Sequence, residues 1–342
     1  MKKKMIGYLT LVTVWCSILL PKPLVYAQES SPSFGFDAQA QIPEKQIDSK
    51  VSYFHVGAQP NEVFDLIVTL TNATDKEIHL IPGIYRAKTN IAGTVEYTKK
   101  TTKLEAGAQE NIEEIATIQE DEIILPARGT YDCKIHVQMP EKAYTGIQAG
   151  AIRFLKKNTE QPKGNVNNQF AREIGLILES SNPEKLPTKL NLPKVQAGQM
   201  NGRNAALVEI ENNQPKFVSL KNVTGKIQKK GKQKIIAQGT QSEVTIAPNT
   251  RFSLPISIPV FEAGTYVARI TAKEGAKKWT FEKEFTITKE KSKQYNQTDV
   301  SLKSKLSFFE KYKWMIITIF SLIVIDLFLF LVWIHLKKKT NP

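Results

Sequence analysis

The feature that most constrains this chain is a long apolar stretch near its C-terminal end, at residues 314–334. Its 21 residues would form a helix of about 31 Å at about 1.5 Å per residue, which matches the hydrocarbon core of a bilayer. Trp314 and Trp333 stand near its two ends, where an indole ring suits the membrane–water interface. Lysines follow at 337–339, and positive charge favours the cytoplasmic side. We therefore predict one transmembrane helix, with residues 335–342 in the cytoplasm and the preceding chain outside the cell.

One ionisable residue, Asp326, interrupts this apolar stretch. A central Asp costs about 2.5–3.5 kcal/mol, whereas each Leu, Ile, Val or Phe returns about 0.3–0.6 kcal/mol. The stretch contains fifteen such apolar residues, so it still inserts. Asp326 is either a tolerated polar residue in a single anchor or the partner of a polar group on another membrane helix. The second interpretation leads to an alternative function, that of a membrane assembly or signalling subunit that acts through a transmembrane partner helix.

The start of the chain has the pattern of a signal peptide, which we expect to be removed. A basic start and an apolar run at 6–20 lead to small residues that end at Ala27. Without residues 1–27 the only cysteine is Cys133, so no intrachain disulfide can form. A large exported chain without disulfides fits the surface of a bacterium that has no oxidising periplasm.

Charge is divided unevenly along the chain, whose net charge is +14. Residues 28–160 carry 14 Lys and Arg against 19 Asp and Glu, a balance of −5. Residues 161–310 carry 24 against 13, a balance of +11. Such asymmetry indicates two domains with different partners. In an extracellular chain the second half should attract teichoic acids, host glycosaminoglycans or an acidic protein surface, and nucleic acid is not expected as a partner.

Between the two apolar segments, apolar and polar residues alternate with the period of β-strands. In one run, for example, Phe64, Leu66 and Val68 share a face. Turn-forming residues separate the runs at intervals typical of an antiparallel sandwich. We predict an all-β chain with two immunoglobulin-like β-sandwich domains in tandem. One short helix is expected within 104–119, where apolar residues recur at helical spacing.

The order of the parts follows from these signals. A polar stretch rich in turn-forming residues separates the two sandwiches, and about 120 residues are enough for the second to have its own core. A later polar and basic stretch without strong periodicity indicates a stalk. The predicted parts are a signal peptide at 1–27, a first sandwich at 28–157, a linker at 158–170, a second sandwich at 171–288, a stalk at 289–313, a transmembrane helix at 314–334 and a cytoplasmic tail at 335–342.

No arrangement of residues typical of catalysis occurs in the sequence. There is no His-Glu-x-x-His pair, no Gly-x-Ser-x-Gly elbow and no phosphate-binding glycine loop. Cys133 and His136 have a spacing seen in metal sites, but positions three apart on a strand face opposite sides, and we expect Cys133 in the core. The acidic run at 120–122 lacks the ligand pattern of a calcium loop, so it fits a solvated edge better than weak divalent-ion binding. We therefore predict a non-enzyme without catalytic residues, metal or cofactor.

Two places combine residue types that suit ligand binding. The first is a loop entering a strand, where Thr89, Asn90, Gly93 and Tyr97 bring together a hydroxyl, an amide and an aromatic ring. An amide and a ring suit the polar and apolar sides of a glycan or peptide. The alternative is an Asx-type turn followed by a tyrosine of the core.

The second place is a predicted hairpin in the basic half of the chain. Its five lysines are Lys226, Lys229, Lys230, Lys232 and Lys234. They would form a positive tip that attracts polyanions in a salt-sensitive way. A hairpin that is merely soluble is the alternative. Four apolar residues of a later strand share one face and are expected in the core: Trp279, Phe281, Phe285 and Ile287.

Short motifs spread over both halves carry a family resemblance. In the first half they are Phe34-Gly-Phe, Ile42-Pro-Glu-Lys-Gln46, Tyr53-Phe54, Thr89-Asn90 with Gly93 and Tyr97, and Pro140 followed by Gly146-Ile-Gln-Ala-Gly-Ala-Ile152. In the second half they are Ala247-Pro-Asn-Thr250 with Phe252, Ala263-Gly-Thr-Tyr266, and Trp279-Thr-Phe281 with Phe285 and Ile287. In order and spacing these motifs resemble those of the WxL-interacting proteins of Gram-positive surfaces. That family tends to carry paired glycines in the motif at 146–152, where this chain keeps one in the stretch Gln148-Ala-Gly-Ala151.

The resemblance implies an N-terminal domain associated with peptidoglycan and a C-terminal domain that binds host matrix or partner proteins. It also implies a surface complex with secreted proteins that carry a WxL wall-binding domain. We therefore expect a membrane-anchored surface protein that associates with WxL-domain proteins and peptidoglycan. Its basic domain would face host extracellular matrix, anionic polymers or other partners.

Overall fold

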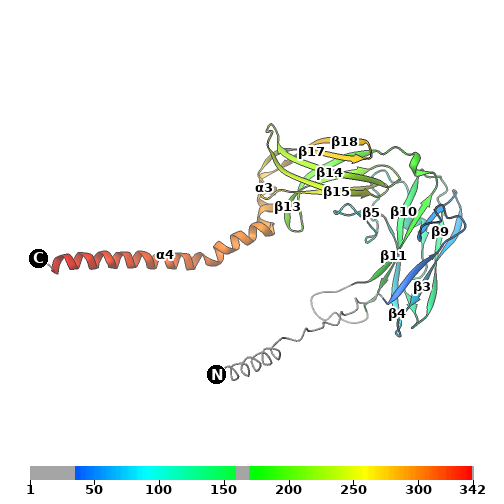
Figure 1. Cartoon of the computed structure of the whole chain (residues 1–342), viewed down its shortest axis with the longest axis horizontal. Coiled ribbons are helices and arrows are strands. Elements are labelled where there is room, and N and C mark those ends of the chain that lie inside the picture. The colour runs from blue at the N-terminus through cyan, green and yellow to red at the C-terminus, as the bar shows by residue number, and fades with distance from the viewer. Residues whose placement is uncertain (1–34, 159–168, 341–342) are drawn as a thin grey trace, which may run out of the picture.

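The computed structural model describes residues 35–158 and 169–340. The predicted signal peptide at 1–27 and most of the predicted linker at 158–170 lie outside these residues. The described chain is mostly β, with two sandwiches followed by a long helix that runs away from the second sandwich (Figure 1). The predicted fold class is therefore confirmed for the described residues.

Nine strands build the first sandwich: β1 (Phe36–Gln41), β2 (Phe54–Gly57), β3 (Val63–Asn72), β4 (Ile78–Arg86), β7 (Ala116–Thr117), β8 (Ile123–Leu125), β9 (Thr130–Gln138), β10 (Ile147–Lys156) and β11 (Ala171–Glu179). They form a four-stranded sheet in the order β1-β3-β9-β7 and a five-stranded sheet in the order β2-β11-β10-β4-β8. β5 (Lys88–Thr89) and β6 (Val95–Glu96) form a separate small ladder. β2 pairs with β11 in parallel, whereas the other neighbouring strands of this sheet pair antiparallel.

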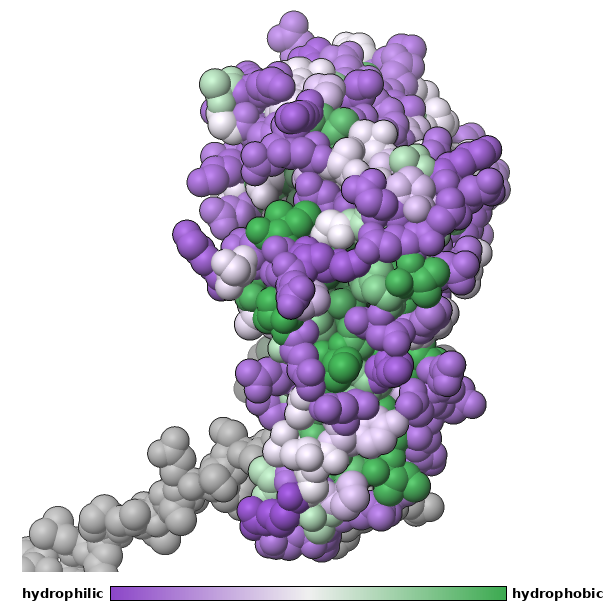
Figure 2. All heavy atoms as spheres, turned by 90° about the vertical axis from the view of Figure 1, so that its right-hand side faces the viewer, coloured by the Kyte–Doolittle hydropathy of each residue, from purple (hydrophilic) through white to green (hydrophobic). Residues whose placement is uncertain are grey.

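The core of this sandwich contains the side chains that alternate inward along its strands. Phe54, Phe154 and Cys133 are fully buried there, which confirms Cys133 as a core residue. The backbone packs closely at Gly150, because an added Cβ would lie 2.6 Å from the carbonyl oxygen of Tyr85. The outer surface seen in Figure 2 is mostly hydrophilic, with apolar residues interspersed in small groups.

Strand β11 departs from the predicted order of the parts. Residues 171–288 are predicted for the second sandwich, but β11 lies between β10 and β2 and pairs with both. Its residues Leu176 and Leu178 are fully buried in the first core. An alternating strand buries one face in any sheet, so its period alone does not identify its neighbours.

The short helix expected within 104–119 is present as a single turn. Only α2 (Ile112–Ile115) is helical, with Asn111 as its N-cap and two buried isoleucines. The residues before it cannot continue the helix, because Ala106 and Gly107 have φ angles of 52° and 73°. The helical spacing of the apolar residues was therefore misleading over most of this range.

Seven strands build the second sandwich: β12 (Leu190–Met200), β13 (Arg203–Asn212), β14 (Val218–Lys229), β15 (Ile235–Ile246), β16 (Thr250–Ser257), β17 (Gly264–Glu274) and β18 (Lys277–Ile287). A three-stranded sheet in the order β12-β13-β16 packs on a four-stranded sheet in the order β15-β14-β17-β18. Of the four β18 residues expected in the core, Phe285 and Ile287 are buried. Trp279 and Phe281 are partly buried against the same core.

Each sandwich contains the same buried turn, centred on an asparagine. The side-chain amide of Asn72 donates to three backbone carbonyls, at 2.8 to 3.2 Å, near the ends of β3 and β8. The amide of Asn212 makes the equivalent three bonds near the ends of β13 and β15, at 2.8 to 3.5 Å. Both side chains are buried, so no water can replace these bonds if the amide is lost.

Replacing either asparagine should therefore destabilise its own sandwich. Asn72→Ala and Asn212→Ala each leave buried carbonyls without partners, and we expect each to lower the free energy of unfolding by about 2–3 kcal/mol. Asn191→Ala is the matched control, because Asn191 is exposed on β12, and it should change the value by less than about 0.5 kcal/mol. Urea unfolding, monitored by circular dichroism, measures the free energy of unfolding of all three variants. Equal stabilities for Asn212→Ala and Asn191→Ala would contradict the assigned role.

Two helices follow the second sandwich, α3 (Lys289–Thr298) and α4 (Val300–Thr340), so the predicted stalk at 289–313 is helical. Thr288 caps α3 by accepting the N–H of Lys291 at 3.2 Å. Between the helices Asp299 is buried and accepts the backbone N–H of Asn204 at 2.7 Å. The Asp299 carboxylate also accepts N–H groups of the first turn of α4. This contact fixes the start of α4 against the second sandwich.

Candidate binding sites

The loop predicted to bind a ligand lies where the two sandwiches meet. The hydroxyl of Thr89 donates to the carbonyl of Thr245 at 3.1 Å and accepts the N–H of Ala247 at 2.9 Å. The N–H of Thr245 donates to the carbonyl of Gly93 at 2.8 Å. Thr245 belongs to β15, and Ala247 is the residue that follows this strand. Thr89 and Gly93 therefore join the first domain to the second.

The other residues of this loop also make internal contacts. The Oδ1 of Asn90 accepts the N–H groups of Ala92 at 2.9 Å and Thr94 at 3.2 Å, which forms an Asx-type turn. A Cβ at Gly93 would lie 2.9 Å from a side chain of β15, and its φ of 76° suits glycine. Tyr97 packs against an apolar cluster drawn from both domains, and burial raises the pKa of Tyr97. The structure thus brings the four residues to one junction, and ligand binding by them stays a prediction.

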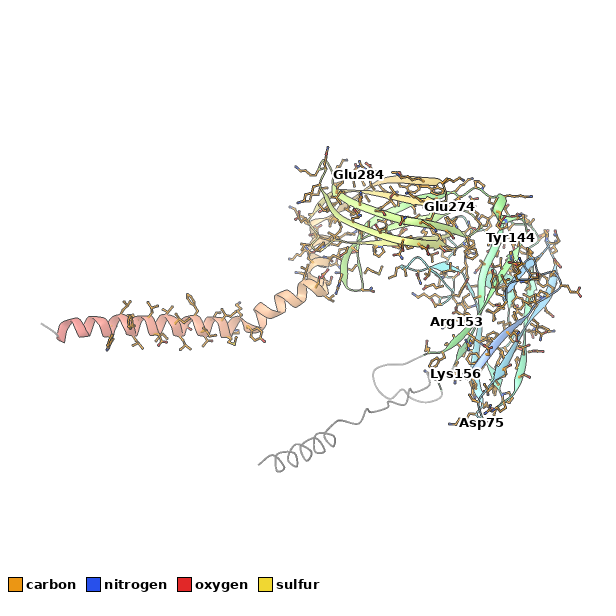
Figure 3. The ribbon with its side chains drawn as sticks, viewed as in Figure 1. Asp75, Tyr144, Arg153, Lys156, Glu274 and Glu284 are labelled. Atoms are coloured by element: carbon orange, nitrogen blue, oxygen red, sulfur yellow. The ribbon has the colours of Figure 1, made fainter. Side chains whose placement is uncertain are left out.

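A second junction contact surrounds Gly146. The N–H of Ile147 donates to the carbonyl of Pro215 at 2.9 Å, and the amide of Asn249 donates to the carbonyl of Ala106 at 2.8 Å. Figure 3 shows nearby Tyr144 at the junction end of the first sandwich, with Asp75 at the opposite end. Gly146 has a φ of 75°, and an added Cβ would lie 2.3 Å from that Pro215 oxygen. Gly146 belongs to one of the family motifs, which was the only sequence signal for this contact.

Gly146→Ala should loosen the junction between the sandwiches. The new methyl group clashes with a backbone oxygen, so the clash is relieved only if the two domains separate. Gly231→Ala is a matched control, because Gly231 has a similar φ of 74° but nothing within 4 Å of an added Cβ. We expect the distance distribution between spin labels on the two sandwiches to broaden in Gly146→Ala and to stay unchanged in Gly231→Ala. An unchanged distribution in both variants would show that this contact does not set the domain arrangement.

A hollow of about 280 Å³ also opens at the junction. Arg86 and Arg251 contribute to its lining, together with Glu105. The Arg86 side chain donates to the carbonyl of Glu110 at 2.8 Å, and burial lowers the pKa of Arg86. Arg251 pairs with Glu211 at 2.9 Å. Each cation also contacts the other domain, because Arg86 donates to the carbonyl of Pro248 at 3.4 Å and Arg251 lies 3.8 Å from Glu105. The two arginines are far apart in the chain, so no sequence pattern could group them.

The structure contains the predicted basic hairpin, formed by β14 and β15, but its lysines do not act as one cluster. The Nζ of Lys229 lies 2.5 Å from Glu262, and the hydrogen bond with this carboxylate raises the pKa of Lys229. The Nζ of Lys230 lies 2.8 Å from Glu284, which Figure 3 labels. Two of the five charges are therefore neutralised by neighbours on the same domain.

The remaining three lysines of the hairpin point to two different places. Lys232 and Lys234 are exposed at the turn. Lys226 lies earlier on β14 and lines a hollow on the open face of the four-stranded sheet. Two of the five lysines thus form exposed ion pairs, two lie at the turn and one lies on the sheet face, and polyanion binding by the hairpin stays a prediction.

The C-terminal helix α4 contains the predicted apolar segment. Its apolar span is Tyr312–Trp333, with a mean hydropathy of 2.9, which begins two residues before the predicted 314–334. Its apolar side chains are exposed all round; Trp314, for example, is 76% exposed. Asp326 is exposed among them. A helix apolar on every side has no aqueous face and needs an apolar environment.

The described residues contain no cluster that could hold a metal ion, and Cys133 is buried. No group of three His, Cys, Asp or Glu side chains among them could hold a metal ion. Burial raises the pKa of the Cys133 thiol to about 12, so the reactive thiolate is scarce near neutral pH. His136 points to the surface and lies 3.0 Å from Asp65, so it diverges from Cys133 as predicted.

Comparisons with solved structures return matches of low identity. They include PapD-like domain 7 of human CEP192, at 12% identity over 48% of this chain and 97% of that chain, with a TM-score of 0.28. The YadV chaperone matches at 11% identity over 74% of this chain and 100% of that chain, with a TM-score of 0.29. The E. coli chaperone DraB matches at 13% identity over 74% and 97%, with a TM-score of 0.29. None of the curated proteins compared with the chain matches it.

Family models match both sandwiches. Residues 36–156 match the peptidoglycan binding domain of the WxL Interacting Protein family, and residues 161–297 match its host binding domain. The second match begins before β11, so it includes a strand that pairs within the first sandwich. The two matches cover most of the chain in the expected order, and the chain therefore belongs to the family of WxL-interacting proteins.

Proposed function

We propose that this surface binding protein is a membrane-anchored scaffold that holds its partners without changing them chemically. The observation that carries the proposal is the succession of two family binding domains and one apolar helix on a single chain. A helix of this length and hydropathy suits the hydrocarbon core of a bilayer. Because Asp299 fixes α4 to the second sandwich, an inserted α4 would keep that domain next to the membrane.

The proposed partners are WxL-domain surface proteins and peptidoglycan. The family description of the first domain supports peptidoglycan binding, and the family name supports the WxL partner. Host extracellular matrix or anionic polymers are proposed partners of the second domain, supported by its family description and by the basic balance of residues 161–310. Binding of this kind needs no catalytic group.

A recovery experiment with the full chain in detergent tests these partners. We expect the chain to sediment with peptidoglycan sacculi and to retain a purified WxL-domain protein, while zymography on sacculi shows no hydrolysis. If the chain bound neither the sacculi nor the WxL-domain protein, the scaffold proposal would be refuted. A cleared zone in the zymogram would instead show a wall hydrolase.

The proposed topology places the sandwiches outside the cell and residues 335–342 in the cytoplasm. Protease added to intact cells whose wall has been removed should degrade the sandwiches and leave a tag at the C-terminus protected. Survival of the sandwiches under these conditions would contradict the proposed orientation. The proposed extracellular partners would then be excluded as well.

Asp326 supports a second candidate function, as a membrane assembly or signalling subunit. It places an ionisable group on an otherwise apolar, exposed helix surface, and such groups often pair with polar groups of other helices. Asp326→Leu should then reduce the recovery of a membrane partner from detergent. Unchanged recovery would leave the helix as an anchor only.

A further inference from the structure

The open face of the sheet β15-β14-β17-β18 carries an ordered arrangement of polar residues. The opposite face of this sheet packs on the core, so outward side chains follow every second position, except at a register shift on β14 between Lys221 and Thr224. These side chains fall into rows that cross the strands, because the strand register aligns them. A hollow of about 580 Å³ lies over this face.

One row places three lysines side by side. Lys221 is in register with Lys273, and Lys273 is in register with Lys278. All three are exposed, and none forms an ion pair within the part of the chain that the structure describes. Like charges directly opposite each other destabilise a sheet. Glu243 stands opposite Lys221 at the β15 end of the row, so the repulsion is centred on Lys273, which has a lysine on each side and opposes folding slightly. An anionic partner would offset this repulsion.

The next row consists of threonines on all four strands. Thr240 is in register with Thr224, Thr224 with Thr271, and Thr271 with Thr280. The hydroxyls of Thr224 and Thr240 lie 3.0 Å apart. Since strands are about 4.8 Å apart, this row presents hydroxyl groups along about 14 Å. Each hydroxyl can both donate and accept hydrogen bonds, as the hydroxyls of sugars do.

A second cationic row lies on the other side of the threonines. Lys226 is in register with Arg269, and Gln238 and Glu282 complete the row. Arg269 pairs with Glu282 at 2.6 Å, so Lys226 is the uncompensated cation of this row. The hydroxyl row is thus flanked by positive charge on both sides. Acidic residues stand at the rim of the face: Glu243, opposite Lys221 on β15, and Glu284, paired with Lys230.

We propose that this sheet face binds an anionic glycopolymer, a chain that carries sulfate or phosphate groups along a hydroxyl-rich backbone. The polymer lies along the threonine row, which bonds its hydroxyls, while the lysines on either side bind its anionic groups. Figure 3 labels Glu284 and Glu274, which lie toward opposite ends of the sheet that carries the site. This inference rests on the proposed function and deepens it, because it moves polyanion binding from the hairpin tip to the sheet face. No aromatic residue lines the hollow, so stacking on a neutral sugar contributes little.

The test compares two double variants that remove equal charge. In the full chain in detergent, Lys273→Gln with Lys278→Gln should weaken binding of heparin or purified teichoic acid about tenfold, since each lysine makes a charge-assisted hydrogen bond. Lys232→Gln with Lys234→Gln, on the hairpin turn, should change it less than about twofold. Thr271→Val keeps the branched shape of the side chain, and it should weaken binding about threefold through loss of one hydroxyl. Comparing heparin with teichoic acid identifies a host or a wall source of the polymer, and neutral dextran should not bind.

A thermal melt separates binding from folding. Lys273→Gln with Lys278→Gln should melt at the same temperature as the unaltered chain or higher, because repulsion within the lysine row is removed. The proposal is overturned if this variant binds as well as the unaltered chain, if the hairpin variant loses as much affinity, or if the unaltered chain binds neither polymer. Recovery of sacculi freed of teichoic acid, and of a WxL-domain protein, should not change when measured on the same preparations. Loss of that recovery would count against the scaffold function and not against this site.

Discussion

A fragment of the first domain that ends at residue 157 is expected to stay unfolded, whereas one that ends at residue 182 folds. The reason is β11, which lies between β10 and β2 in the five-stranded sheet. Without β11, backbone groups of β10 lose their partners and β2 loses its neighbour in the sheet. Leu176 and Leu178 also leave the core, and each stabilises it by about 1.5–3 kcal/mol when buried. Together these losses rival the total stability of a domain, about 5–15 kcal/mol.

Amide signal dispersion in NMR spectra and urea unfolding of both fragments measure this difference. A control fragment ending at residue 182 carries Leu176→Asp and Leu178→Asp, so it keeps the length of the chain but loses the buried side chains of β11. We expect it to behave as the short fragment does. Cooperative unfolding of the short fragment would show that β11 is dispensable and would support the predicted boundary near residue 171.

A chain that ends at residue 311 should leave the membrane fraction almost completely. The removed part includes the apolar span Tyr312–Trp333, in which each Leu, Ile, Val or Phe favours insertion by about 0.3–0.6 kcal/mol. Asp326 opposes insertion by about 2.5–3.5 kcal/mol, which the apolar residues exceed together. The sandwiches have no comparable apolar helix in the described residues. The proposed membrane attachment of the chain therefore depends on this span.

Fractionation of cells after an alkaline wash measures the attachment. The full chain with Asp326→Leu is the control, because it keeps the span and removes its only ionisable group between Trp314 and Trp333. This variant should remain in the membrane fraction, whereas the shortened chain should appear in the soluble fraction with both sandwiches folded. Retention of the shortened chain in washed membranes would assign the attachment to another part of the protein.

The sequence predicted the two sandwiches because strand periodicity depends only on which side chains face the core. Cys133 could be assigned to the core in this way, and Phe285 and Ile287 likewise. Helical spacing also predicted the short helix α2, but it did not indicate where this helix begins. There the left-handed conformations of Ala106 and Gly107 end the regular structure, and apolar spacing does not report them.

The candidate sites were harder to predict, because they depend on contacts between distant residues. The sequence marked Thr89 and Gly93 as candidate ligand-binding residues, which stays a prediction. Their bonds to β15 join residues more than 150 positions apart, so the sequence could not indicate them. It also grouped five lysines by their proximity in the chain. The ion-pair partners of Lys229 and Lys230 lie far from them in the chain, at Glu262 before β17 and Glu284 on β18. The sequence could not indicate that two of the five lysines form such pairs.

What the sequence determined by itself is local: the period of the strands, the apolar span and the uneven charge, each readable from consecutive residues. The tertiary structure alone decided which strands are neighbours, and with this it assigned β11 to the first sheet. It also decided the register that aligns Lys221, Lys273 and Lys278 across three strands. The physical reason is that a strand carries the same backbone hydrogen-bonding groups whatever its neighbour. Its partner is therefore selected by the packing of the whole domain.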